Sequence, residues 1–299
     1  MPLPFHLRIV RTLLQKLNYH LSGDPLAPGE PFSPARLSEV TRVLRSLPAA
    51  DEGARRYLEK HIPRLARTLA LAPPPGPAGH ALELGCYMQI TPFLQRLCGY
   101  REVRGAYHGA AGQTEHQRIE FLDGVFECAV DLFDAERDPF PYPDEHFDLV
   151  IAGEIIEHVI YDPMHLLIES RRVLRDGGHL LLTTPNAGSL ASAAKALSGH
   201  ANPQVYSLYR RPRAGEALEI GHVREYTVQD LRESLTAAGF EITALFTTFM
   251  AEFAVYLPLL GFLRDNGYPT EHRGEQIYCL AIKRAALPVD RYPSVLYTE

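Results

Sequence analysis

Short apolar runs alternate with helical patterns between residues 80 and 284. The helical patterns begin at Thr91, at Pro163 and at Thr227. Strands separated by helices imply right-handed crossovers and a parallel sheet, which holds its ligands at the carboxyl ends of the strands. We therefore predict an α/β fold. The apolar runs that predict strands are residues 80–84, 103–107, 126–130, 147–153, 178–184, 241–249 and 275–284.

The N-terminal region shows helical spacing of its apolar positions. Ser33 and Pro34 are typical of the N-cap and the first position of a helix, and a second helical pattern contains Pro63. The stretch PPPGPAG cannot continue a helix and predicts a boundary. We therefore divide the chain into an N-terminal helical cap region, residues 1–72, a linker, residues 73–79, an α/β domain, residues 80–284, and a C-terminal tail, residues 285–299.

Composition and charge argue against several classes of protein. Apolar residues make up 46% of the 299 positions, an ordinary globular composition, and the formal charge of -6 lacks the basic excess that nucleic-acid binding requires. Arg8 and Arg11 interrupt the apolar N-terminal stretch, so we expect no signal peptide. Glu252 and Pro258 interrupt the apolar run over residues 244–263, so we expect no membrane span.

The cysteines show neither a CxxC pair nor a spacing typical of metal ligands. Each lies among apolar residues, as a buried free thiol does. We therefore expect a reducing, cytoplasmic location and no bound metal. The four cysteines are Cys86, Cys98, Cys128 and Cys279.

Four stretches carry the chemistry, in the order ALELGC, FPYPDEHFDLVIAGEIIEHV, RVLRDGGHLLLTTPN and GHVREYTVQDLRESLTAAGF. This ordered set resembles the class I S-adenosylmethionine-dependent methyltransferases, particularly the bacterial small-molecule enzymes, over residues 79–284. The resemblance implies a Rossmann-like, seven-stranded, mostly parallel sheet with an antiparallel last strand. It also implies methyl transfer from S-adenosylmethionine to a small-molecule acceptor, at an oxygen atom. The helical N-terminal region lies outside the resemblance, and we expect it to cap the active site. A homodimer is one oligomeric state that we consider.

The resemblance further implies which residues bind the cofactor. Glu83 and Gly85 match the start of the first motif, near the methionine end of the cofactor. Asp131 is similar to the acid that reaches the adenine amino group, and Ala152 and Gly153 match the backbone that faces the cofactor's ammonium group. The complete predicted set is Glu83, Gly85, Cys86, Tyr87, Tyr107, Asp131, Leu132, Ala152 and Gly153.

Two departures from the family's pattern fall in the cofactor site. The second and third glycines of the first motif align with Tyr87 and Gln89, and the ribose-binding acid aligns with Tyr107. Glycine permits positive φ and close approach of backbone to ligand. A Tyr87 ring that turns outward leaves the pocket open, whereas one that turns inward fills it. Two hypotheses follow, an active methyltransferase or a catalytically degenerate one that acts as a binding or regulatory partner.

The predicted acceptor site contains candidate bases. A hydroxyl nucleophile needs a base with a pKa near neutrality, and His158 and His222 are suited to that role. Each histidine also has a structural alternative, a hydrogen bond to a neighbouring loop or to backbone amides at a helix start. We place Glu157, Asn186 and Tyr226 in the substrate pocket.

Two further expectations concern the whole chain. A nicotinamide-dependent oxidoreductase is the weaker alternative, because the chain lacks GxGxxG and a YxxxK pair. The apolar segment from Phe249 to Leu263 is predicted to fold over the acceptor pocket as a lid.

Overall fold

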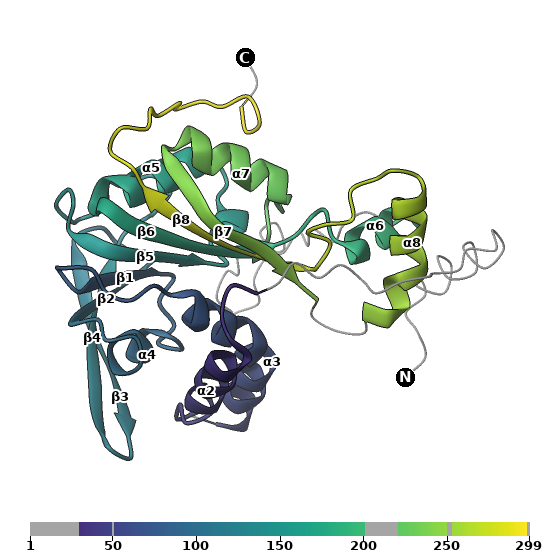
Figure 1. The fold of residues 1–299 in the computed structure, drawn as a ribbon. Coiled ribbons are helices and arrows are strands. Elements are labelled where there is room, and N and C mark those ends of the chain that lie inside the picture. Colours follow the sequence, from purple (N-terminus) through teal and green to yellow (C-terminus); the bar gives the residue numbers. More distant parts are fainter. Residues whose placement is uncertain (1–29, 50, 201–220, 250–252, 298–299) are drawn as a thin grey trace, which may run out of the picture.

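The computed structural model describes residues 30–49, 51–200, 221–249 and 253–297. In this part of the chain, eight strands form one sheet in the order β3-β4-β2-β1-β5-β6-β8-β7 (Figure 1). The strands are β1 (His80–Leu84), β2 (Glu102–Tyr107), β3 (Gln113–Phe121), β4 (Gly124–Leu132), β5 (Phe147–Gly153), β6 (Leu174–Pro185), β7 (Phe240–Thr248) and β8 (Gln276–Lys283).

The strand directions confirm the predicted α/β class. Strands β4, β2, β1, β5 and β6 run parallel to one another, whereas β8, the last strand, is antiparallel to both β6 and β7. The sheet also contains β3, a strand beyond the seven predicted, which pairs antiparallel with β4 at the edge of the sheet. Its sequence, QTEHQRIEF, is mainly polar and exposed, so it gave no hydrophobic signal.

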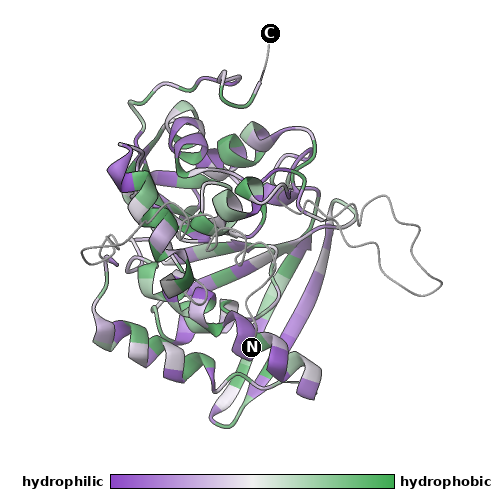
Figure 2. Ribbon diagram, turned by 90° about the vertical axis from the view of Figure 1, so that its right-hand side faces the viewer, coloured by the Kyte–Doolittle hydropathy of each residue, from purple (hydrophilic) through white to green (hydrophobic). Residues whose placement is uncertain are grey.

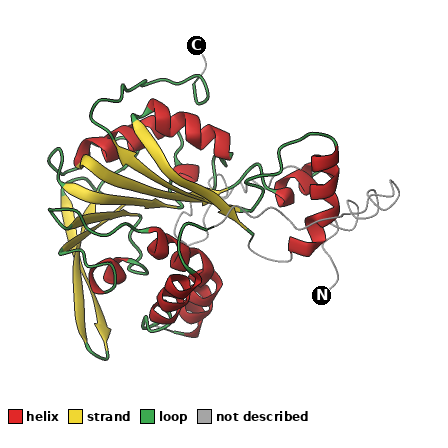
Figure 3. Cartoon of the chain, in the orientation of Figure 1, coloured by secondary structure: helices red, strands yellow, loops and turns green. Residues whose placement is uncertain are grey.

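Helices cover both faces of the sheet (Figures 1 and 3). On one side lie α2 (Pro34–Leu44), α3 (Glu52–Leu71) and α4 (Thr91–Arg96), and on the other lie α5 (Pro163–Val173) and α7 (Val228–Ala237). The predicted caps form, since the Ser33 side chain accepts a hydrogen bond from the Arg36 amide and Thr227 forms a capping box with Asp230. These caps satisfy backbone amides that would otherwise lack partners.

The side chains of the central strands divide between two hydrophobic cores. Leu82 of β1 and Val150 of β5 point into the core under α5 and α7. Ala81 and Leu149, one position away, point into the core under α2, α3 and α4. Because successive side chains of a strand face opposite sides, a sheet covered on both faces requires continuous apolar strands. Figure 2 shows green, hydrophobic stretches along the ribbon inside the molecule. Strand β5 is buried from Phe147 to Ala152.

A smaller hydrophobic cluster lies outside the sheet. Helix α6 (Leu190–Leu197) and helix α8 (Leu257–Asp265) pack on each other through Leu190, Leu259 and Leu260, next to the short 3-10 helix η3 (Phe253–Tyr256). Figure 1 shows α6 and α8 side by side at the end of the sheet. Across the described ranges, no helix combines the length and the apolar character needed to cross a membrane.

After β8, the C-terminal segment contacts the start of helix α5. Arg291 forms an ion pair with Asp162, the N-cap residue of α5, and the Tyr297 hydroxyl donates to the same carboxylate at 2.5 Å. Burial alone would raise the pKa of Asp162, but hydrogen bonds from Arg291 and Tyr297 lower this pKa to about 2. The ionised form of Asp162 therefore anchors the end of the described chain to α5.

Candidate active site

A cavity of about 720 Å³ lies at the carboxyl ends of β1, β2, β4 and β5. Its position is the one expected for ligands of an open α/β sheet. Helix α3 contributes one wall through Tyr57, Arg64, Leu65 and Thr68. The predicted site residues that line the cavity are Glu83, Gly85, Tyr87, Tyr107, Gly153 and His158, together with Gln89.

The corner after β1 has no room for a side chain at Gly85. This residue has φ +66, and a Cβ atom added to it would overlap the Cδ1 atom of Ile155. Only glycine combines a positive φ at little cost with the absence of a Cβ atom. The first glycine of the predicted motif is therefore required by the geometry of this corner.

Tyr87 does not fill the cavity. Its side chain is 66% exposed, its hydroxyl lies 3.0 Å from the Tyr107 hydroxyl, and the two rings meet edge to face at 82°. The left-handed conformation of this turn falls on the next residue, Met88, with φ 61, and the Met88 side chain is buried in the core beneath the turn. The outward orientation considered for Tyr87 is therefore the one observed, and the hollow beside Gly85 stays open.

Two acidic side chains and one cation meet inside the cavity. Glu83 is buried, and the Thr91 hydroxyl donates a hydrogen bond to its carboxyl group. Burial raises the pKa of Glu83 well above its usual value. Arg64 of α3 lies with its Nε atom 4.0 Å from Oε2 of Glu154. The cavity thus contains a positive charge opposite carboxyl groups, a suitable environment for a zwitterionic ligand.

Asp131 lies outside the cavity lining. Its carboxylate accepts hydrogen bonds from Arg104 (2.7–2.9 Å), from the Thr114 hydroxyl (2.7 Å) and from the Tyr142 hydroxyl (2.8 Å). Burial alone would raise the pKa of Asp131, but these hydrogen bonds lower it. The structure therefore gives Asp131 a set of partners within the sheet and does not bring it to the cavity, in contrast to the expectation that it reaches the adenine group.

Other predicted cofactor residues are also displaced from the cavity surface. Cys86 is buried, with Sγ 3.2 Å from the Thr91 hydroxyl, and Ala152 is 1% exposed within the core of β5. Leu132 is packed against the core formed with α2, α3 and α4. Cys86, Leu132 and Ala152 therefore lie beneath the cavity surface and do not line the cavity.

The cavity contains an acid that the sequence did not single out. Asp134 follows the end of β4 and lines the cavity, next to Phe133 and Ala135. Its Oδ1 atom accepts a hydrogen bond from the Glu136 amide at 2.9 Å, which fixes the side chain in the loop. Its position in the sequence could have identified Asp134, because a residue just after a parallel strand lies at the edge of the sheet where ligands bind.

Glu157, His158 and His222 come together beside the cavity, which His158 lines. Glu157 and His158 belong to the 3-10 helix η1 (Ile156–His158), and one potential ligand atom of each of the three residues lies within 4.8 Å of the others. Burial, followed by repulsion from Glu154, raises the pKa of Glu157 well above its usual value. A hydrogen bond to Glu225 raises the pKa of His222. The two candidate bases are thus neighbours, with ring centroids 5.0 Å apart.

Asn186 and Tyr226 hold this region in place. The Asn186 amide group donates to the His272 and Gly274 carbonyls and accepts from the Gly188 amide. Tyr226 is buried, and its backbone pairs with that of Asn186 in an isolated β-bridge. Neither residue lines the cavity, so the structure places both beside the predicted substrate pocket and not in its wall.

The proposed lid lies elsewhere. None of the described residues between Phe249 and Leu263 lines the cavity, and Leu259 and Leu260 of this segment are buried against α6. The prediction of a lid is therefore wrong for the described part of the segment, because its apolar side chains are already covered by another helix.

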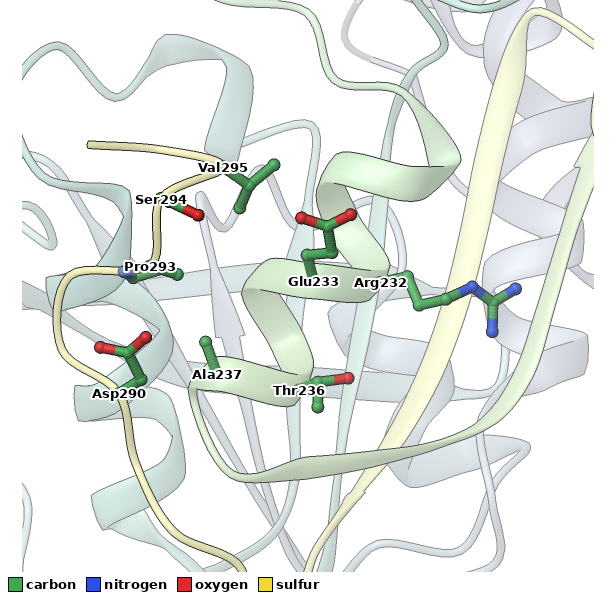
Figure 4. Close-up of a pocket in the computed structure, with 8 residues that line it drawn as sticks. All are labelled: Arg232, Glu233, Thr236, Ala237, Asp290, Pro293, Ser294 and Val295. Atoms are coloured by element: carbon green, nitrogen blue, oxygen red, sulfur yellow. The ribbon is translucent and has the colours of Figure 1, made fainter. Parts of the chain in front are cut away.

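A second hollow, of about 410 Å³, lies between α7 and the C-terminal segment (Figure 4). Figure 4 shows that it is framed by the side chains of one helix and one extended stretch. None of the predicted site residues lines it. Its lining residues are Arg232, Glu233, Thr236, Ala237, Asp290, Pro293, Ser294 and Val295.

Comparisons with known proteins identify the family of this chain. A family model described as a methyltransferase domain matches residues 52–245, more than half of the 299 residues. A protein of Mycolicibacterium smegmatis, named as a probable S-adenosylmethionine-dependent methyltransferase, is 30% identical over 113 residues, which are 38% of this chain and 36% of that protein. The matched region thus spans about a third of this relative.

Solved structures with a similar arrangement include two methyltransferase chains. One, an S-adenosylmethionine-dependent methyltransferase of Thermotoga maritima, has a TM-score of 0.48 at 18% identity and covers 78% of this chain and 95% of that chain. Another belongs to a complex of the Haloferax volcanii Trm112 methyltransferase activator, with a TM-score of 0.48, 12% identity and coverage of 84% and 96%. The family assignment rests on the match of the family model to residues 52–245, and by that match the chain belongs to the methyltransferase-domain family.

Proposed function

We propose that this protein transfers a methyl group from S-adenosylmethionine to an oxygen atom of a small-molecule acceptor. The observation that carries the proposal is the open cavity at the carboxyl end of β1, in a chain that belongs to the methyltransferase-domain family. A tyrosine ring turned into this corner would have favoured the degenerate alternative, but Tyr87 is exposed at the rim.

The cavity fits the cofactor in size and in chemistry. Small-molecule pockets have volumes of about 300–1,000 Å³, and the cavity of about 720 Å³ falls within this range. Arg64 supplies a positive charge and Glu83 and Glu154 supply carboxyl groups for an amino-acid portion, and Gly85 lets the backbone approach it. Asp134 and Tyr107 supply hydrogen-bond acceptors for a nucleoside portion. The bound cofactor supplies an electrophilic methyl group.

The residues of this chain contribute mainly by positioning the reactants. Helix α3 closes one side of the cavity, and the strand ends form the opposite wall. Holding two reactants in line removes much of the entropic cost of their meeting. A hydroxyl acceptor must also lose its proton, and the group of Glu157, His158 and His222 is placed to assist that loss. We further propose a cytoplasmic location, since all four cysteines are free thiols.

Calorimetric titration of the full chain with S-adenosylmethionine and S-adenosylhomocysteine tests the proposal. We expect saturable binding of both, and a rise in melting temperature with ligand concentration. Asp134→Asn should weaken binding about tenfold, because a charge-assisted hydrogen bond is worth about 1.5 kcal/mol. The matched control is Asp123→Asn, in the exposed β3–β4 turn. Absence of binding at millimolar ligand by the folded protein would refute the proposal.

A further inference from the structure

We propose that Glu157, His158 and His222 bind a divalent first-row transition-metal ion, and that the acceptor oxygen binds to this ion. The spacing of the cysteines predicts no metal site, but none of these three residues is a cysteine. The role of the ion rests on the proposed methyl transfer, whereas its binding can be tested without it.

The three side chains come from two segments that the fold fixes against each other. Glu157 and His158 lie in η1, after β5, and His222 lies in the segment that leads to α7. The Val223 amide donates to the Glu157 carbonyl at 2.7 Å, so the two segments are joined next to the cluster. The potential ligand atoms lie within 4.8 Å of one another, close enough for one ion to contact all three after small side-chain movements.

Both histidines are oriented as metal ligands usually are. The Nδ1 atom of His158 lies 3.2 Å from the Gly221 carbonyl oxygen, and that of His222 lies 3.3 Å from Oε1 of Glu225. These oxygen acceptors favour a proton on Nδ1 of each ring, and the neutral tautomer with that proton carries its lone pair on Nε2. Histidines that bind metals typically donate their other ring nitrogen to a carbonyl or a carboxylate in this way, which fixes the tautomer and the ring.

The carboxyl group of Glu157 provides an independent observation. Glu157 is 0% exposed, and its Oε2 atom accepts a hydrogen bond from the Thr184 hydroxyl at 2.9 Å. Its Oε1 atom is buried and has no hydrogen-bond partner. Buried polar atoms in native proteins are almost always satisfied, and a bound cation satisfies a carboxylate oxygen. A metal ion in the cluster supplies the contact that the protein itself does not.

The donor set selects the class of ion. Two imidazoles and one carboxylate suit Zn²⁺, Co²⁺ and similar ions, whereas Mg²⁺ and Ca²⁺ prefer sets of oxygen ligands. Three protein ligands leave coordination positions open, as in catalytic metal sites. Because His158 also lines the cavity, an open position can face the acceptor.

The ion would change how the acceptor loses its proton. A hydroxyl bound to the ion has a lowered pKa and releases its proton to solvent. The resulting oxygen forms a bond to the methyl carbon as the bond between that carbon and the sulfonium sulfur breaks, so that the sulfur keeps the electron pair. In this arrangement His158 and His222 are metal ligands and not bases.

Metal binding by the tag-free full chain, stripped with a chelator, tests the inference. Titration with Co²⁺, followed by its visible absorption and by calorimetry with Zn²⁺, should show one ion per chain. His158→Ala and His222→Ala should each weaken binding at least tenfold. His116→Ala, an exposed histidine on β3, is the matched control and should bind normally.

Each outcome of the titration decides the question. If Co²⁺ and Zn²⁺ do not bind at millimolar concentration, or bind equally well to both histidine variants, the site does not exist as proposed. Should His158→Ala fail to fold, His222→Asn carries the test, since the His222 side chain is 35% exposed. Cofactor titration of the same metal-free samples separates the two proposals, because cofactor binding without metal binding overturns only the metal site.

Discussion

Replacing Asp131 distinguishes a structural acid from a cofactor-binding one. In Asp131→Ala, Arg104 loses its bidentate partner, and the hydroxyls of Thr114 and Tyr142 lose their acceptor. The cavity lining is untouched, because Asp131 does not belong to it. We therefore expect a less stable protein whose folded form binds S-adenosylmethionine with unchanged affinity.

The size of the effect follows from the burial of the pair. Removing one partner of a buried ion pair costs about 3–5 kcal/mol. The Arg104 side chain is 29% exposed and regains some hydration, whereas Asp131 is 9% exposed, so we expect the lower end of that range, about 3 kcal/mol. For a chain of this size, this corresponds to a fall in melting temperature of about 6–12 °C.

Two measurements on one sample decide the matter. Urea denaturation followed by circular dichroism gives the loss of stability, and calorimetry below the transition gives the cofactor affinity of the folded protein. In a double-mutant cycle, Arg104→Ala with Asp131→Ala should cost less than the sum of the single changes, because the two residues share one interaction. The reasoning is refuted if Asp131→Ala keeps its stability but loses cofactor affinity tenfold or more.

Three further predictions concern the turn after β1 and the C-terminal anchor. Gly85→Ala should destabilise the protein by about 1–2 kcal/mol from backbone strain alone and weaken cofactor binding. Adding Ile155→Ala to this variant should recover part of the lost stability, since Cδ1 of Ile155 occupies the space that the new Cβ atom needs. Calorimetry that finds no recovery of stability contradicts this account. Tyr87→Phe should change cofactor affinity less than threefold, as its ring lies at the rim; a larger loss by the same titration would show that its hydroxyl contacts the ligand. The pKa of Asp162 is lowered to about 2, so its contribution to stability is present above the unfolded-state pKa of about 3.9 and is lost as the pH falls towards 2. Between these pH values, Asp162→Asn should therefore lose less stability than the unchanged protein in an acid titration. Identical stability curves for the two proteins would argue against the anchor.

The strands that could be predicted are those whose burial requires a clear pattern of apolar residues in the sequence. β5 is buried on both faces, and its sequence, FDLVIAG, is an apolar run interrupted by one polar residue, Asp148. β3 has one neighbour and a mainly exposed surface, so its polar sequence resembles that of a loop. Edge strands are held by backbone pairing more than by apolar burial, and backbone pairing has no sequence signature.

The candidate site was predictable in location but not in detail. The motif after β1 indicated the cavity, and Gly85 has the predicted role in the turn. The orientation of Tyr87 depends on the positive φ of Met88 and on contact with Tyr107, neither of which is encoded in local pattern. Asp131 lies within β4, and its ion pair with Arg104 of the neighbouring strand β2 determines its environment. Spacing along the chain therefore could not assign its role.

Helix α3 forms one wall of the cavity although it precedes the linker and the sheet in the chain. The walls of the cavity therefore come from separate parts of the chain, with strand ends on one side and a helix before the linker on the other. Exposed positions of that helix, such as Tyr57, can diverge between relatives without disturbing the sheet. The lining of the cavity can thus evolve through a helix that lies outside the sheet, while the wall formed by the strand ends stays unchanged.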